Sequence, residues 1–365
     1  MANWLLPFAL LLPGLAWGQW QPLAQSAQSP VHDAGFALQE RQLLVPQDGR
    51  LEVIDLNTGA ASQFSLGSSE DDKLPTLRQL LAPFKDGWLL DNSNGYQAWN
   101  ADLTQPQGEL PIKCRDPQLL RQSPSQRFIG CGDQVRDLKA QQNHQTLGIG
   151  PGSYSQSLFV GDLAYVALAQ PYREDSNQVQ VLNLADFSSK ALLSGKESLF
   201  IAAPSVGDFL AVAVKGGFLQ QDQVRIFQVP GLAEGQRIKG QVKGLAVSPQ
   251  GRYLLVAQDK KLRRFLRQEG GTFEELPALA VAVAPQSRQS PQGRAESNSL
   301  AFMDDDRVLL VTQQGALQAW DLASGTLLDE GQPHPGTPWR LQWTPTGFAA
   351  LQWQDGSLEV FKQTP

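Results

Sequence analysis

The chain contains few of the side chains that most often bind metal ions or carry out catalysis. Among its 365 residues there are three histidines and two cysteines. Histidine is the usual proton donor or acceptor near neutral pH, and His32, His144 and His334 lie far apart in the sequence. No Gly-x-Ser-x-Gly, His-Glu-x-x-His or phosphate-loop motif occurs. We therefore expect no catalytic centre, no metal site and no cofactor.

The chain is also short of basic charge. Its 30 lysines and arginines are outnumbered by 36 aspartates and glutamates, and the basic residues are dispersed along the sequence. Nucleic acid is not expected as a partner, because binding to a phosphate backbone needs clustered positive charge. Acidic runs such as Asp304-Asp305-Asp306 lack the spacing of a calcium-binding loop. Most of them occupy positions where Asp favours a turn, and we interpret them as turns.

The N-terminus has a short hydrophobic block but not a long one. Residues 1–18 are apolar, are interrupted by Pro7 and Pro13, and end in Ala16-Trp17-Gly18, which suits cleavage by signal peptidase. The alternative is a membrane anchor, but a spanning helix needs about 20 apolar residues. No cysteine lies near the cleavage point, so a lipid anchor is not expected. We expect a signal peptide over 1–18, a periplasmic or secreted protein, and no membrane insertion after cleavage.

One unit recurs along the chain at intervals of 37 to 55 residues. Each copy has an apolar strand, a tight polar turn, a second apolar strand, a Gly or Asp turn and a third, alternating strand, which is typical of a propeller blade. The clearest copy runs from Leu300 to Leu328 and contains Trp320-Asp321. The residues equivalent to Asp321 in the eight units are Asp55, Asn100, Asp137, Asn183, Gln228, Leu266, Asp321 and Lys362.

With Trp320-Asp321 in the dipeptide position, the copy closely resembles a WD40 repeat. The resemblance covers the chain from residue 19 to 365, with the seventh unit the strongest match and the third and sixth the weakest. It implies an all-β fold, a single β-propeller of about eight four-stranded blades, or seven blades if one weak unit is not a blade. The last unit ends before a fourth strand, so we expect Trp20 to Gln25 to supply that strand and close the ring.

The resemblance also implies a role for one histidine. In WD40 repeats a histidine ahead of the first strand packs with the Asp of the turn between the second and third strands. Here those residues are His334 and Asp355, which the resemblance implies form a structural hydrogen bond. Trp339, Trp343 and Trp353 alternate along the strands of the same unit, and we expect them to pack between blades rather than to bind a ligand.

The two cysteines are expected to form a disulfide bond. An even pair in an exported chain favours this interpretation. Cys114 precedes the first strand of the third unit and Cys131 follows its second strand. Those two connections emerge on the same face of a propeller, so the two sulfur atoms can meet.

The connections on the two faces of the expected ring differ in length. Connections between first and second strands are short in every unit, whereas those from second to third strands and from blade to blade contain the irregular insertions. Long loops on a rigid scaffold are where binding usually resides, and aromatic or Arg side chains are the usual anchors. We therefore expect a partner to bind the face that carries Tyr172, Arg173, Phe218, Arg288 and Arg294.

These features predict a non-enzymatic protein–protein interaction scaffold of the bacterial periplasm. Asp55-Leu-Asn-Thr-Gly59 and Asp321-Leu-Ala-Ser-Gly325 are also similar to turns of quinoprotein propellers, but Gln63 and Asp329 stand where those repeats place a Trp. The alternative is a propeller hydrolase of the lactonase type that works from acidic residues in the central channel. Fold alone does not decide between the two.

Overall fold

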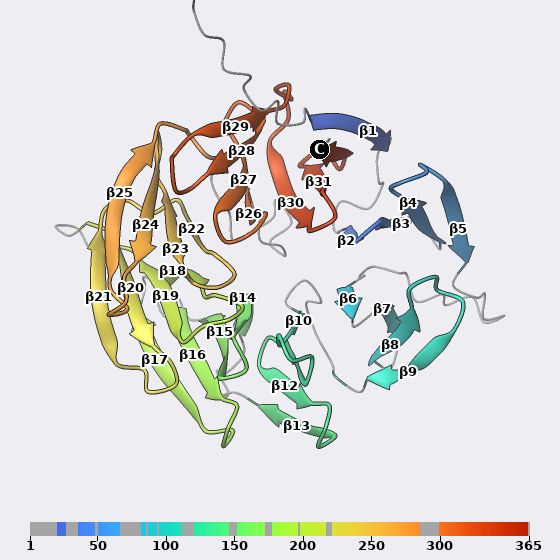
Figure 1. Cartoon of the computed structure of the whole chain (residues 1–365). Helices are drawn as coiled ribbons and strands as arrows, with labels where there is room; N and C mark the ends of the chain where they lie inside the picture. Colours follow the sequence, from blue (N-terminus) through green and yellow to red (C-terminus); the bar gives the residue numbers. More distant parts are fainter. Residues whose placement is uncertain are drawn as a thin grey trace, which may run out of the picture.

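The computed structural model describes residues 20–26, 36–47, 50–65, 82–84, 87–92, 95–110, 112, 120–145, 152–171, 177–195, 198–216, 221–284 and 299–363. These residues form strands and turns, and they contain no helix that is long and apolar enough to span a bilayer. Eight four-stranded antiparallel sheets are arranged around a central axis (Figure 1). The predicted all-β propeller is therefore confirmed with eight blades, and the seven-bladed alternative is wrong.

The blades follow one another along the chain. The first four consist of β2 (Ala37–Gln39), β3 (Gln42–Gln47), β4 (Arg50–Asp55) and β5 (Ala61–Ser65); β6 (Ala82–Phe84), β7 (Gly87–Asn92), β8 (Gly95–Asn100) and β9 (Pro106–Leu110); β10 (Arg121–Gln122), β11 (Phe128–Cys131), β12 (Gln134–Asp137) and β13 (Gln142–Gln145); β14 (Gly152–Val160), β15 (Ala164–Pro171), β16 (Asn177–Asn183) and β17 (Ser189–Gly195). The last four consist of β18 (Ser198–Ala202), β19 (Phe209–Val214), β20 (Gln223–Gln228) and β21 (Glu234–Lys239); β22 (Gly244–Val247), β23 (Tyr253–Ala257), β24 (Leu262–Arg267) and β25 (Phe273–Leu279); β26 (Leu300–Phe302), β27 (Arg307–Val311), β28 (Leu317–Asp321) and β29 (Leu327–Glu330); β30 (Pro338–Thr344), β31 (Phe348–Trp353), β32 (Leu358–Gln363) and β1 (Trp20–Ser26).

Within each blade the first strand lies nearest the axis and the fourth lies at the periphery (Figure 1). Six of the third strands end at the residue identified from the sequence. The other two, β24 and β32, end one residue later, after Leu266 and Lys362. The third and sixth units, the weakest matches in the sequence, both form complete four-stranded blades.

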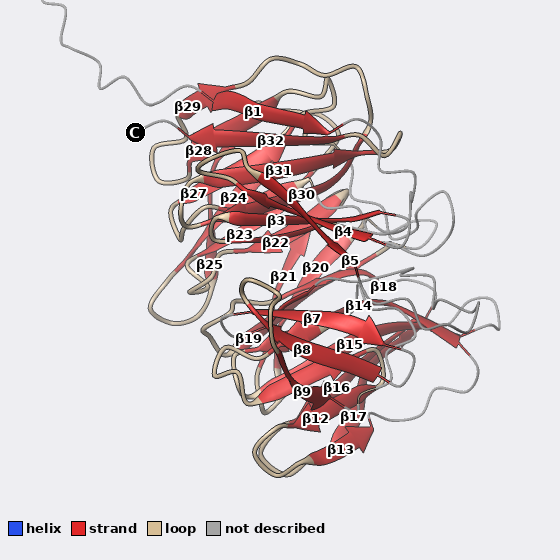
Figure 2. Ribbon diagram, turned by 90° about the vertical axis from the view of Figure 1, so that its right-hand side faces the viewer, coloured by secondary structure: helices blue, strands red, loops and turns tan. Residues whose placement is uncertain are grey.

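The ring is closed by the N-terminal strand, as predicted. Strand β1 is the fourth strand of the last blade and pairs antiparallel with β32, from Trp20 opposite Gln363 to Ser26 opposite Leu358. Figure 2 shows β1 beside β32, β31 and β30. Strand β32 would otherwise expose unpaired backbone groups along its outer edge. The two ends of the described chain are therefore joined within one sheet.

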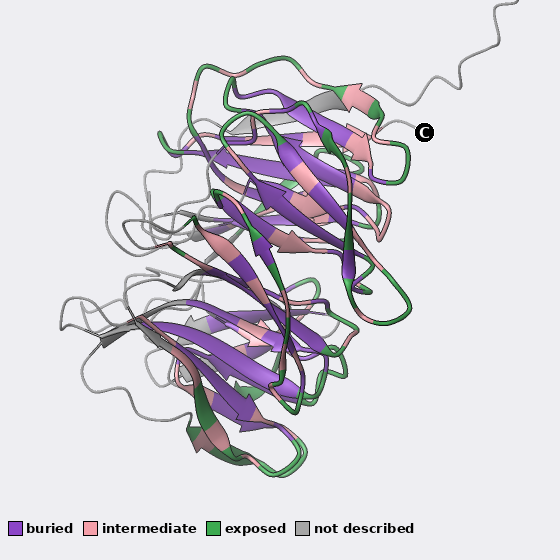
Figure 3. Cartoon of the chain, turned by 90° about the vertical axis from the view of Figure 1, so that its left-hand side faces the viewer, coloured by how far each residue is buried: buried purple, intermediate pink, exposed green. Residues whose placement is uncertain are grey.

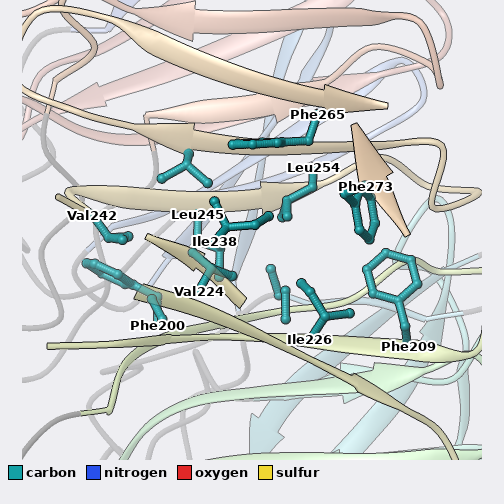
Figure 4. Close-up of a cluster of buried hydrophobic side chains, with 14 residues drawn as sticks. Phe200, Phe209, Val224, Ile226, Ile238, Val242, Leu245, Leu254, Phe265 and Phe273 are labelled. Carbon is teal, nitrogen blue, oxygen red and sulfur yellow. The ribbon is translucent and has the colours of Figure 1, made fainter. Parts of the chain in front are cut away.

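Among the described residues, the hydrophobic core forms eight clusters of buried side chains, one at each boundary between neighbouring blades. Both faces of a blade pack against a neighbour, so second strands such as β23 and β31 are buried along their whole length. Figure 3 shows long buried stretches along strands of the ring, with exposed residues mainly in the turns and outer strands. Figure 4 shows the cluster between blades five and six, in which the rings of Phe209 and Phe273 meet edge to face. In blade eight, Trp353 and the partly buried Trp343 pack in the cluster between blades seven and eight, which confirms the packing role predicted for them, and Trp339 is buried.

Candidate interaction surface

The strand connections open on two faces of the ring. Because consecutive strands are antiparallel, connections from first to second and from third to fourth strands lie on one face, which we call the turn face. Connections from second to third strands and from one blade to the next lie on the other face, which we call the loop face. The turn face is built from short turns throughout the described chain.

Side-chain oxygens form the turns of the turn face. The buried hydroxyls of Ser123, Ser248 and Thr344 each accept a hydrogen bond from the backbone N–H at the start of the second strand, at 2.9 to 3.3 Å. At the end of the third strand in blade one, Asp55 Oδ1 accepts from two backbone N–H groups of the following turn, at 2.8 and 3.0 Å. Asp and Ser favour turns because their side chains can make these local bonds.

Other aspartates of the turn face hold neighbouring blades together. Their side-chain oxygens accept hydrogen bonds from the adjacent blade at 2.6 to 2.8 Å, and the pairs are Asp162 with Ser125, Asp208 with Arg267, Asp305 with Gln250 and Asp306 with Arg252. In the part of the chain that the structure describes, no three His, Cys, Asp or Glu side chains gather into a group that could hold a metal ion. These acidic turns are thus engaged in structural contacts across blade boundaries.

The residues implied as a His–Asp pair have separate hydrogen-bond partners. His334 stacks on Trp353 with ring centroids 3.9 Å apart, and its Nδ1 accepts the N–H of Gly336 at 2.9 Å. Asp355 Oδ1 accepts the Ser357 hydroxyl at 2.6 Å and the Ser357 N–H at 2.9 Å. These bonds lower the pKa of Asp355, and the nearby charge of His334 lowers it further. Within residues 299–363, the two side chains therefore share no hydrogen bond, and each is held by a residue two positions further along the chain.

On the loop face, blades five and six present three connections that are bonded to one another. They follow β19, β21 and β23, and Asp222 is at the centre of their network. Its carboxylate accepts the N–H groups of Gly216 at 3.0 Å and Val242 at 3.2 Å, and its backbone carbonyl accepts the N–H of Gly240 at 2.8 Å. One aspartate thus holds the connection within blade five against the connection that leads to blade six.

Asp259 extends this network to blade seven. Gln241 Nε2 donates to Asp259 Oδ2 at 2.8 Å, and Lys243 Nζ lies 3.7 Å from Asp259 Oδ1. Gln258 Nε2 donates to the carbonyl of Gln241 at 3.1 Å. From blade seven, Gln313 Nε2 donates to the carbonyl of Asp259 at 3.2 Å. Three consecutive blades therefore share one hydrogen-bonded surface on the loop face.

Exposed lysines lie in or next to the connections that hold these two aspartates. We call them the lysine cluster, and its five exposed members are Lys215, Lys239, Lys243, Lys260 and Lys261. Beside them, Arg263 donates to the carbonyl of Lys239 at 2.7 Å and pairs with Glu275 at 2.7 Å. Within the described chain, Lys243 is the one member that has a carboxylate within ion-pair distance, namely that of Asp259.

This cluster is not evident from the sequence. Its lysines are spread between positions 215 and 261, so they looked dispersed, and the one local signal is the pair Lys260-Lys261 in a turn between two apolar strands. The predicted partner-binding residues all lie outside the described residues, so that prediction stays open; they are Tyr172, Arg173, Phe218, Arg288 and Arg294.

The predicted disulfide also stays a prediction. Cys131 is buried at the end of β11 in the boundary between blades two and three. Its proposed partner, Cys114, lies outside the described residues.

A closed ring of eight four-stranded blades defines this chain as a β-propeller protein. The computationally designed Ika8 protein is similar to it, at 17% identity with a TM-score of 0.62; the match covers 94% of this chain and 99% of that chain. The β-propeller domain of Myceliophteria thermophila Cps50 (Swd1) is also similar, at 14% identity with a TM-score of 0.53; the match covers 94% of this chain and 100% of that domain. No family model and no curated protein matches the sequence. At these identities the likeness shows the fold alone.

Proposed function

We propose that this protein is a non-enzymatic, WD40-like interaction scaffold of the bacterial periplasm that binds a protein partner on its loop face. The observation that carries the proposal is the contrast between the two faces. On the turn face, Asp162, Asp208 and Asp306 bind the neighbouring blade. On the loop face, exposed lysines of blades five and six lie in or next to connections that are hydrogen-bonded to one another. Within the described chain only Lys243 among them forms an ion pair.

A scaffold of this kind benefits from a surface that does not need to order itself on binding. The loop-face connections around the lysines are held by Asp222 and Asp259, so their backbone is positioned before a partner arrives. Preorganisation reduces the entropy lost on association. The assignment to the periplasm rests on the apolar block at 1–18 and on the pair Cys114 and Cys131.

Affinity capture from a periplasmic fraction tests the proposal. The wild-type chain is compared with a loop-face variant, Tyr172→Ala/Arg173→Ala/Phe218→Ala, and a turn-face control, Leu163→Ala/Val206→Ala. Leu163 and Val206 are large apolar side chains exposed on the turn face. We expect the loop-face variant to lose most of the captured partner, while the control retains it and both keep the wild-type melting temperature.

Two results would contradict the proposal. Retained capture by the loop-face variant together with loss in the turn-face control would place the partner on the other face. Turnover of lactone or ester substrates by the purified chain, abolished by replacing carboxylates of the central channel, would instead support the alternative of a propeller hydrolase.

A further inference from the structure

We infer that the lysine cluster of blades five and six is the docking site for an acidic polypeptide segment of the partner. This inference rests on the proposed function, because it names the part of the loop face that makes contact and the chemistry of the segment that it holds. It is carried by three observations: the segregation of charge, the fixed backbone beneath it, and the mixture of polar groups among the lysines.

Positive charge is concentrated at this place in an acidic protein. The described residues 215–216, 221–222, 239–243 and 258–263 together contain six basic and two acidic residues, whereas the whole chain has a formal net charge of −6. Five of the chain's twelve lysines form the cluster. Like charges gathered on one surface repel one another and attract an oppositely charged partner, so this surface favours an acidic ligand.

The two aspartates within the cluster do not cancel its charge. Asp222 is turned into the backbone network, where the N–H groups of Gly216 and Val242 donate to its carboxylate. Asp259 is shared by Gln241 and Lys243. The other four lysines have no carboxylate within ion-pair distance among the residues that the structure describes, and they are Lys215, Lys239, Lys260 and Lys261.

One further carboxylate lies close enough to be influenced by the cluster. The charge of Lys261 helps to lower the pKa of Glu275, but the larger cause is the hydrogen bond from Arg263, which forms the ion pair with Glu275. Because Arg263 already neutralises Glu275, the charge of Lys261 remains available to a ligand.

The polar groups between the lysines favour a polypeptide over a uniform polyanion. The Asp259 side chain is 58% exposed and would repel the phosphates of a nucleic acid or an anionic bilayer. The side-chain amides of Gln241, Gln258 and Gln313 lie in the same network and can bond to the amides of a peptide backbone. A segment with spaced Asp or Glu residues can meet the lysines and avoid Asp259.

The test uses the purified full chain and a fluorescent twelve-residue peptide rich in Asp and Glu, with binding measured by anisotropy. The cluster variant is Lys260→Glu/Lys261→Glu. The control is Lys139→Glu/Lys190→Glu, which makes the same change in net charge at two exposed lysines near the turn face of blades three and four. We expect the cluster variant to bind at least about tenfold more weakly and the control to bind like the wild type, with all affinities falling as salt rises.

Equal weakening in the two double variants, or no binding by the wild type, would overturn the inference. Tighter binding to an oligonucleotide or to phosphatidylglycerol vesicles than to the peptide, lost in the cluster variant, would show that the ligand is not an acidic polypeptide.

Periplasmic capture distinguishes failure of this inference from failure of the proposed function. If the cluster variant still captures the full amount of the wild-type partner, only the lysine inference fails. If the wild type captures no specific protein, the scaffold proposal fails too.

Discussion

Arg127 Nη2 lies 2.6 Å from Oδ2 of Asp137, whose side chain is only 1% exposed at the end of the third strand of blade three. The other carboxylate oxygen accepts the N–H groups of Lys139 at 2.8 Å and Ala140 at 3.0 Å. The hydrogen bond from Arg127 outweighs the effect of burial and, with these backbone donors, lowers the pKa of Asp137 to about 2. A single aspartate thus joins the ion pair to the turn.

This ion pair predicts a loss of stability in acid. The pKa of Asp137 in the folded protein lies below its unfolded value of 3.8, so its carboxylate stabilises the fold above about pH 4, and this stabilisation disappears as the pH falls through the folded pKa. The full contribution is on the order of 2 kcal/mol. From pH 7 to pH 3, the free energy of urea unfolding should fall by about 1 kcal/mol more in the wild type than in Asp137→Asn.

A matched control is available in blade one. Asp55 caps the same turn there, without an arginine in hydrogen-bond contact among the described residues. Asn occupies this position naturally as Asn100 and Asn183. We expect Asp55→Asn to change stability little at pH 7, and an equal loss in the two variants would contradict the role of the ion pair.

A second prediction concerns the packing of Arg264 against Gly325. The guanidinium of Arg264, in blade six, is almost fully buried and donates to the carbonyls of Pro277, Leu322 and Ala323. Gly325, in blade seven, has a φ of +75°, and a Cβ on it would lie 2.5 Å from Arg264 Nη2. Gly325→Ala therefore adds both backbone strain and a steric clash, and it should lower the free energy of unfolding by about 2 kcal/mol or more.

A glycine in blade one separates these two causes. Gly59 holds the position of Gly325 there, with a φ of +70° and no atom within 4 Å of an added Cβ. Gly59→Ala should therefore cost only the backbone strain, about 1 kcal/mol. If denaturant unfolding shows the same loss of unfolding free energy in both variants, the steric clash with Arg264 does not contribute to the destabilisation of Gly325→Ala.

A third prediction concerns ring closure by β1. We compare a chain that begins at Gln19 with one that begins at Ala27, which lacks the strand paired with β32. Removing β1 exposes the edge of β32 and opens the last blade, so the melting temperature should fall by about 5 °C or more. Calorimetry of the two chains checks this, and an unchanged melting temperature would show that the strand does not stabilise the ring.

A fourth prediction concerns Cys114 and Cys131. If they are joined, denatured and unreduced protein should contain no titratable thiol, and reduction should release two. Reduction should also lower the free energy of unfolding by about 3 kcal/mol in the chain-entropy model. Two thiols detected before reduction would rule out the disulfide.

Local chemistry made the blades predictable from the sequence. Ser248 and Thr344 begin turns that their own hydroxyls stabilise, and the third strands end at or next to the eight residues identified in advance. The N-terminal strand was also predictable, because the last unit contains three strands and a propeller blade needs four. The turns and strands within a unit depend on residues that are neighbours in the chain, whereas the pairing of β1 with β32 follows from the strand that the last unit lacks.

The tertiary structure alone decided which residues meet across blades. Nothing near Arg264 in the sequence indicates that it will bond to the carbonyl of Ala323, and His334 bonds to Gly336 although the repeat implied Asp355. The lysine cluster likewise brings together side chains from Lys215 to Lys261 that no local pattern connects. The sequence by itself determined the blade and its repetition, since turns and alternating strands follow from short-range bonding. The surface charge pattern depends on how the ring aligns separate connections, and that alignment is set by packing between blades.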